Sequence, residues 1–167
     1  GNVKINGNFS QGVQTFTSPA LFCHAEGRFT NAYGSYSHAE GTSTTASAYG
    51  SHAEGQDTKT FGTSSHAEGY STVAYGNYSH AEGYSTTPYG DYSHVEGQSN
   101  RAYGVGSHAE GQTSYTYGTG SHAEGYSTIS SGTWSHSEGG NTKTYGVGSH
   151  AEGWFTIASG SYSHAEG

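Results

Sequence analysis

Eleven histidines, a residue type suited to metal binding and proton transfer, lie on one arithmetic series with a step of 14 residues. A glutamate follows each histidine by two positions and a glycine by three, in a unit spelled Ser-His-Ala-Glu-Gly with Cys23, Val95 and Ser137 as its substitutions. The candidate site residues are therefore His24, Glu26, His38, Glu40, His52, Glu54, His66, Glu68, His80, Glu82, His94, Glu96, His108, Glu110, His122, Glu124, His136, Glu138, His150, Glu152, His164 and Glu166.

Catalysis by these residues is not expected, although a serine precedes every histidine except His24. Neighbouring residues on a strand point to opposite faces, so Ser37 cannot hydrogen-bond to His38 as a nucleophile does to its base. The His-x-Glu motif of zinc deaminases requires a distant Pro-Cys-x-x-Cys segment, and Cys23 is the only cysteine. We therefore predict no catalytic residues and no enzymatic activity.

Metal binding is a less favoured alternative. Imidazole and carboxylate are good ligands, and a histidine and a glutamate two residues apart on a strand point the same way. A metal site, however, needs three or four converging ligands and is usually built once or twice in a protein rather than eleven times. We therefore predict no resident metal and no cofactor, and interpret the His/Glu pairs as structural.

The elements that position these pairs follow from a second, weaker copy of the same pattern. Each 14-residue unit consists of two heptads of the form small-x-Ala-x-Gly-x-x, and the second reads roughly Thr-x-Ala-Tyr-Gly. Alternation of period two over five residues, ended by glycine, predicts a short strand and a turn. Each unit therefore predicts a coil of two five-residue strands. Serine, threonine, alanine and glycine would face inward, and histidine, glutamate and the aromatic residues outward.

The composition excludes a conventional globular core. Leu, Ile, Val and Phe together fill 16 of 167 positions, whereas glycine fills 28. Coils lined by such small side chains must bring their two sheets close together, and one rod buries too little apolar area to offset its ordering entropy. An outer face must then be buried elsewhere, which predicts an oligomer. A net charge of −8 argues against nucleic acid as a partner, and no apolar run is long enough to insert into a membrane.

A second outward row is aromatic. It contains Tyr33, Phe61, Tyr75, Tyr89, Tyr103, Tyr117 and Tyr145 on the second strand of each coil, with serines in place of the aromatic residue at positions 47, 131 and 159. One interpretation is stacking that joins neighbouring coils. The other is a flat aromatic surface that contacts a saccharide or a protein, and the spacing does not separate the two.

Residues 1–22 do not follow the repeat. Phe9, Phe16, Leu21 and Phe22 cluster here, and solenoids need their ends closed, so this segment is predicted to be an N-terminal cap or a degenerate first coil. The chain lacks an initiator methionine and ends on a complete motif at Gly167. We therefore expect flanking anchor, stalk or targeting segments in a longer protein.

The heptads, doubled into 14-residue units over about residues 23–167, closely resemble the head repeats of YadA-like trimeric autotransporter adhesins. The same repeat, spelled Ser-His-Ala-Glu-Gly, occurs in phage tail-fibre and tail-spike proteins. The resemblance implies a left-handed parallel β-roll, three copies of which associate side by side. In the adhesin heads the positions held here by histidine and glutamate are often apolar and face the trimer interior. Carried over, this orientation makes the His/Glu pairs the trimer interface. Each buried carboxylate would then need a hydrogen bond from a histidine of a neighbouring chain, a serine hydroxyl or a backbone N–H.

These observations predict an all-β chain with a cap over residues 1–22 and a β-roll of about ten 14-residue repeats over residues 23–167. The resemblance implies a structural and attachment module of a homotrimeric fibre on a virion tail or bacterial surface, extracellular, with a host glycan or protein as its further partner. Two alternatives stay open. One is an adhesin head that itself binds a host glycan or matrix protein, and the other is a His-rich metal-binding array.

Overall fold

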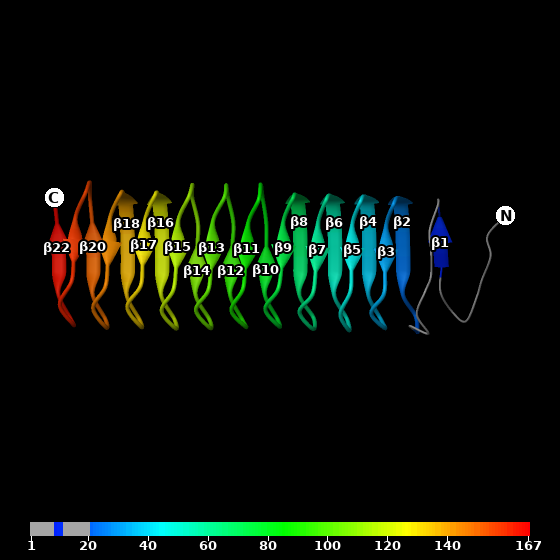
Figure 1. The fold of residues 1–167 in the computed structure, drawn as a ribbon, viewed down its shortest axis with the longest axis horizontal. Coiled ribbons are helices and arrows are strands. Elements are labelled where there is room, and N and C mark those ends of the chain that lie inside the picture. Colours follow the sequence, from blue (N-terminus) through cyan, green and yellow to red (C-terminus); the bar gives the residue numbers. More distant parts are fainter. Residues whose placement is uncertain (1–8, 12–20) are drawn as a thin grey trace.

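The chain folds into a parallel β-solenoid, described by a computed structural model over residues 9–11 and 21–167. Each turn of the solenoid takes 14 residues, so that Ala39 pairs in register with Ala53 of the next coil. The coils stack in one line from the N-terminal to the C-terminal end (Figure 1). The described residues contain no helix, and therefore no helix that is long and apolar enough to cross a membrane. The predicted all-β parallel solenoid of 14-residue coils is confirmed.

The first strand of every coil belongs to one 12-stranded sheet, and the second strands form a separate row. The first-strand sheet contains β1 (Phe9–Gln11), β2 (His24–Arg28), β4 (His38–Thr42), β6 (His52–Gln56), β8 (His66–Tyr70), β10 (His80–Ala81), β12 (His94–Val95), β14 (His108–Ala109), β16 (His122–Tyr126), β18 (His136–Gly140), β20 (His150–Glu152) and β22 (His164–Glu166). The second-strand row contains β3 (Asn31–Ala32), β5 (Thr45–Ala46), β7 (Lys59–Thr60) and β9 (Val73–Ala74), followed by β11 (Thr87–Pro88), β13 (Arg101–Ala102), β15 (Tyr115–Thr116), β17 (Ile129–Ser130), β19 (Lys143–Thr144) and β21 (Ile157–Ala158).

The second-strand row is divided into a four-stranded and a six-stranded sheet at Pro88. The backbone N–H of Val73 donates to Thr86 O at 3.0 Å and that of Tyr75 donates to Pro88 O at 3.0 Å, so the coils still touch there. Proline has no N–H to donate back, and the ladder between β9 and β11 is therefore incomplete. Only this backbone hydrogen bond is missing, and the coils stack there as elsewhere.

The prediction of five residues for both strands of a coil is wrong for the second strand, which has two residues in every described coil. For the first strand it holds in β2, β4, β6, β8, β16 and β18, whereas the other first strands have two or three residues. The backbone N–H groups of Tyr33 and Gly34 both donate to Ala46 O, at 2.8 and 3.3 Å. Two successive donors on one acceptor mean that the chain bends directly after Ala32. A bend, and not further pairing, thus follows each second strand.

The interior is lined by small side chains, as the alternation predicted. Ala39, Ala53 and Ala74 have no exposed surface, and Thr72 is equally buried. The hydroxyl of Thr116 donates to Ser107 Oγ at 2.9 Å across the interior. Because single hydroxyl groups from the two strands of a coil reach each other, the sheets lie close together.

Every seventh residue turns a corner in the left-handed backbone region. These corners are mostly not glycines, and φ is 60° at Thr113 and 58° at Trp134. Glycine is required instead where the first strands of successive coils approach most closely. At Gly69, φ is +105° and an added Cβ would lie 2.2 Å from Gly83 O. The glycine of Ser-His-Ala-Glu-Gly therefore permits the stacking of the coils.

The N-terminal prediction falls largely outside the described residues, which exclude Phe16. β1 pairs in parallel with β2, with Phe9 opposite His24, as a degenerate first coil would. Leu21 and Phe22 are exposed. The cap or degenerate coil over residues 1–22 stays a prediction.

Candidate functional site

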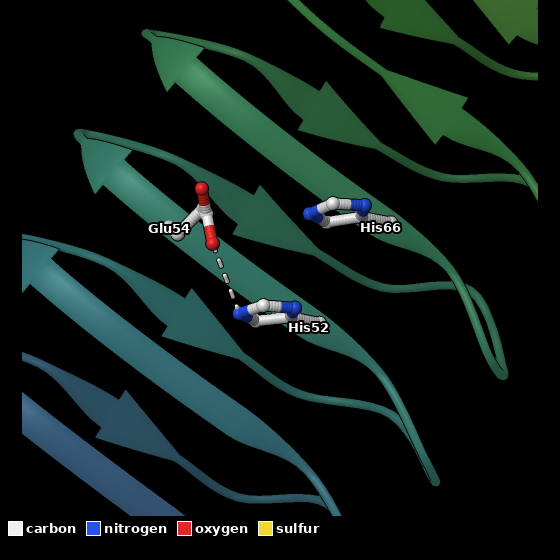
Figure 2. A group of neighbouring side chains, drawn as sticks. All are labelled: His52, Glu54 and His66. Atoms are coloured by element: carbon white, nitrogen blue, oxygen red, sulfur yellow. Dashed lines mark ion pairs between the residues drawn. The ribbon is translucent and has the colours of Figure 1, made fainter.

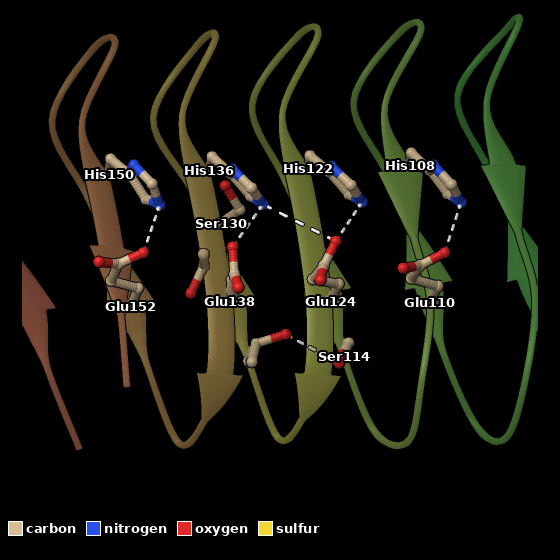
Figure 3. Close-up of polar contacts among 12 residues, drawn as sticks. His108, Glu110, Ser114, His122, Glu124, Ser130, His136, Glu138, His150 and Glu152 are labelled. Carbon is tan, nitrogen blue, oxygen red and sulfur yellow. Dashed lines mark hydrogen bonds and ion pairs between the residues drawn. The ribbon is translucent and has the colours of Figure 1, made fainter. Parts of the chain in front are cut away.

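The His/Glu row, defined as the eleven histidines and eleven glutamates of the repeat, runs along one outer face of the first-strand sheet. Register pairs each histidine with the histidine of the next coil, for example His122 with His136. The imidazole rings are stacked along the row, with centroids 4.7 Å apart and planes 2° apart for this pair. Figure 3 shows four successive coils with their histidines in line and a glutamate beside each. The predicted placement of histidine and glutamate on one face is confirmed.

Histidine and glutamate of the same coil face each other within one chain. The Nε2 to Oε2 distance is 3.4 Å for His38 with Glu40 and for His52 with Glu54, and reaches 4.0 Å for His136 with Glu138. These separations exceed those of a well-formed N–H···O hydrogen bond. A carboxylate of the row thus lies close to an imidazole of its own coil without being hydrogen-bonded to it.

Two coils depart from this pairing. His164, at the end of the row, approaches Glu152 of the preceding coil at 3.8 Å. Among the described residues, His80 has no carboxylate oxygen within 4.0 Å of its ring nitrogens, although it stacks on His66 and His94 at 4.9 Å. His80 therefore stacks on the neighbouring histidines of the row but does not lie close to a carboxylate.

The row is half-buried in a single chain, and several of its histidines are weaker bases as a result. The pKa of His108 is lowered to about 4, mainly by burial and also by the neighbouring His122 and His94, against the opposing effect of the carboxylates. Burial likewise lowers the pKa of His52 and His66. At neutral pH these imidazoles are uncharged, so their approach to a glutamate is not an ion pair.

The glutamates repel one another along the row. Burial raises the pKa of the Glu110 carboxyl, and the adjacent Glu96 and Glu124 raise it further. The carboxylates of neighbouring coils thus lie close enough together to disfavour the ionised form of Glu110.

The Nε2 atoms of the row are polar, buried and without a hydrogen bond in the single chain. This holds for His38, His52, His66, His80, His94, His108, His122, His136 and His150. A buried polar atom without a partner destabilises the structure by about 1–3 kcal/mol. In coil after coil, the Nε2 atom of the row would therefore be stabilised by a hydrogen-bond partner or a ligand.

Each serine of the repeat lies on the opposite face from its histidine. The hydroxyl of Ser37 points into the coil and donates to Gly34 O at 2.6 Å, and Ser65 does the same to Gly62 O at 2.7 Å. The repeat serines of the described coils therefore do not satisfy the glutamates, and none of them places its hydroxyl against a histidine as a nucleophile would.

Groups of three ligands form between successive coils. In four of the five groups, the histidine and glutamate of one coil are joined by the histidine of the next, and in all five the three ligand atoms lie within 4.8 Å of one another. Figure 2 shows His52, Glu54 and His66 in this arrangement. The other groups are His108/Glu110/His122, His122/Glu124/His136, His136/Glu138/His150 and, at the C-terminal end, Glu152/His164/Glu166. The third ligand comes from the stacking of the coils.

The aromatic row, defined as Tyr33, Phe61, Tyr75, Tyr89, Tyr103, Tyr117 and Tyr145, lies on the outside of the coils. Each of its residues directly follows a second strand, whereas the sequence predicted it to be part of the strand. Five of its rings form one continuous stack from Phe61 to Tyr117, with centroids 4.8–5.1 Å apart. These five side chains are 38–51 % exposed. Stacking between coils and an exposed aromatic surface therefore coexist. Tyr33 and Tyr145 stand apart from the stack because serines occupy positions 47 and 131.

Sequence reasoning did not single out a third line of rings at the corners. Tyr78 and Tyr92 stack at 5.1 Å and are more than half exposed. Their spacing of 14 residues is the signal that could have identified them. The sequence analysis also did not identify a role for Arg101. Its guanidinium lies 6.0 Å from the centre of the Tyr115 ring.

Comparisons with models of known protein families match none of them, and no curated protein shows significant similarity to the chain. The chain is therefore assigned by its coordinates to the class of parallel β-solenoid repeat proteins.

Proposed function

We propose that the solenoid is a left-handed β-roll of the YadA-like type and a structural and attachment module of a homotrimeric, extracellular fibre. Three chains would lie side by side with their His/Glu rows facing the common axis. The fibre projects from a virion tail or a bacterial cell and attaches to a host surface glycan or protein. The module carries out no catalysis, binds no nucleic acid and does not insert into a membrane.

The observation that carries this proposal is the row of buried Nε2 atoms without partners, repeated at the spacing of the coils. A surface that satisfies such a row must present partners at the same spacing. Another copy of this chain, aligned in parallel, has that spacing by construction. The small-residue interior adds to the argument, because a core of alanine, serine and threonine buries little apolar area per coil.

Site-directed cross-linking tests the side-by-side arrangement. A cysteine at position 68 (Glu68→Cys) would lie on the His/Glu row, and one at position 75 (Tyr75→Cys) on the aromatic row. In parallel, in-register chains, identical positions near the axis approach each other, so Glu68→Cys should form a disulfide between chains upon mild oxidation. Tyr75→Cys, the matched control on the outer face, should not. Equal cross-linking of both variants, or none with either, would contradict the proposal.

The second candidate, an adhesin head that itself binds a host glycan or matrix protein, is favoured by the aromatic row. Exposed, stacked rings provide a surface for the apolar face of a sugar. Binding to immobilised glycans and matrix proteins tests it. Tyr89→Ala combined with Tyr103→Ala should abolish binding, whereas Tyr162→Ala, outside the row, should retain it. Binding that survives the double substitution would place the contact elsewhere.

A further inference from the structure

We propose that the His/Glu row binds zinc or a similar divalent transition-metal ion, each held by two histidines of successive coils and the glutamate between them. The group His52, Glu54 and His66 illustrates the site (Figure 2). All three ligands come from one chain, so this inference does not depend on trimer formation. The inference concerns a metal ion that binds to the row, whereas the proposed function concerns the association of three chains through the row.

The geometry of this group is close to that of a zinc site. Zinc binds imidazole nitrogen at about 2.0–2.1 Å and carboxylate oxygen at about 2.0–2.2 Å, so tetrahedral ligand atoms lie about 3.4 Å apart. His52 Nε2 and Glu54 Oε2 are 3.4 Å apart. The rings of His52 and His66 are stacked with centroids 4.8 Å apart, and a tilt of these half-exposed rings brings the second nitrogen into range. Water completes the coordination.

The ligand types of the group suit a divalent transition-metal ion. Imidazole nitrogen and carboxylate oxygen are ligands that zinc binds well, and the ligand atoms of His52, Glu54 and His66 all lie within 4.8 Å of one another. An ion held here would also occupy the Nε2 atoms, which otherwise have no hydrogen bond.

The overlap of the groups fixes how many ions can bind at once. The three groups between His108 and His150 share His122 and His136, and each Nε2 has a single lone pair to donate. The first and third groups can therefore be filled together, and the middle group cannot. With the group at His52, one chain holds three ions on paired histidines. The C-terminal group, with one histidine and two carboxylates, adds a site of different composition.

Two matched variants test this count. His122→Gln removes a histidine that two groups share, and leaves the groups at His52 and His136 intact. His80→Gln removes a histidine of the same stack that belongs to none of the groups. Both substitutions interrupt the ring stack once, so any difference between them reports on metal ligation. His136→Gln, which also affects two groups, serves if His122→Gln does not fold.

The experiment is equilibrium dialysis of the chain against Zn²⁺ alone at pH 7.5, with the molar mass of each sample measured in parallel. We expect saturable binding with dissociation constants of about 1 µM or lower. His122→Gln should bind one ion fewer than the parent chain, and His80→Gln an equal number. Absence of saturable binding, or the same loss in both variants, would overturn the metal site. A monomeric molar mass of the parent chain, with zinc binding as expected, would count against the trimer only.

Discussion

Acidification should destabilise the solenoid through its histidines, and His108 offers the clearest case. Burial lowers its pKa from 6.5 to about 4 in the folded chain, whereas the unfolded chain keeps the ordinary value. Between these two values the unfolded state binds a proton that the folded state does not. The stability of the fold is therefore unaffected above about pH 6.5, falls as the pH decreases toward 4, and levels off below that.

The magnitude follows from the pKa difference and the exposure of the ring. At about 1.4 kcal/mol per pKa unit, the change at His108 corresponds to about 3 kcal/mol. The side chain is 35 % exposed, however, so screening by solvent reduces this value to about 1–2 kcal/mol. Burial also lowers the pKa of His38, His52, His66, His94 and His136, so these histidines add to the loss of stability.

Chemical denaturation at pH 7.5, 6, 5 and 4.5 measures this effect. The parent chain should lose stability progressively, and His108→Gln should lose less, by about 1–2 kcal/mol between the two extremes. The matched control is His164→Gln at the last coil, where the side chain is 55 % exposed and keeps more of its water. A stability that stays flat from pH 8 to 4 would refute the reasoning. So would an acid response of His108→Gln identical to that of the parent.

Three further substitutions test the packing, each by its effect on the free energy of unfolding. Asn100→Ala should cost about 3 kcal/mol, because the amide donates to Glu96 O and Gly111 O and accepts from Ser114 N, and each bond contributes about 1 kcal/mol. Gly69→Ala should cost about 3 kcal/mol or more, since its Cβ would lie 2.2 Å from Gly83 O. Its control, Gly106→Ala, has nothing within 4 Å and should cost about 1 kcal/mol. Thr113→Asn should stabilise by about 0.5–1 kcal/mol, because φ is 60° there and asparagine tolerates that region. A neutral Gly69→Ala or Asn100→Ala would contradict the packing described.

The strict period of 14 residues made the fold accessible from the sequence. Inward Ala39 and outward His38 follow from alternation alone. The length of the second strand was not accessible in this way. Two successive N–H groups, those of Tyr33 and Gly34, share one carbonyl, and a residue pattern does not encode that bend.

The sequence predicts which residues line the candidate site, but not which of them lie next to one another. The sequence places two ligands, such as His52 and Glu54, on one face of a coil. The third, His66, joins them only because consecutive coils stack in register with parallel rings. The sequence likewise does not predict that His80 lies apart from the carboxylates, because its unit has the common spelling Ser-His-Ala-Glu-Gly.

The molar mass in solution tests the central claim most directly. Light scattering on a size-exclusion column at pH 7.5 should give three times the 17.4 kDa of the chain, as side-by-side association through the His/Glu row requires. A folded monomer would contradict this account, because the half-buried row would then face water alone.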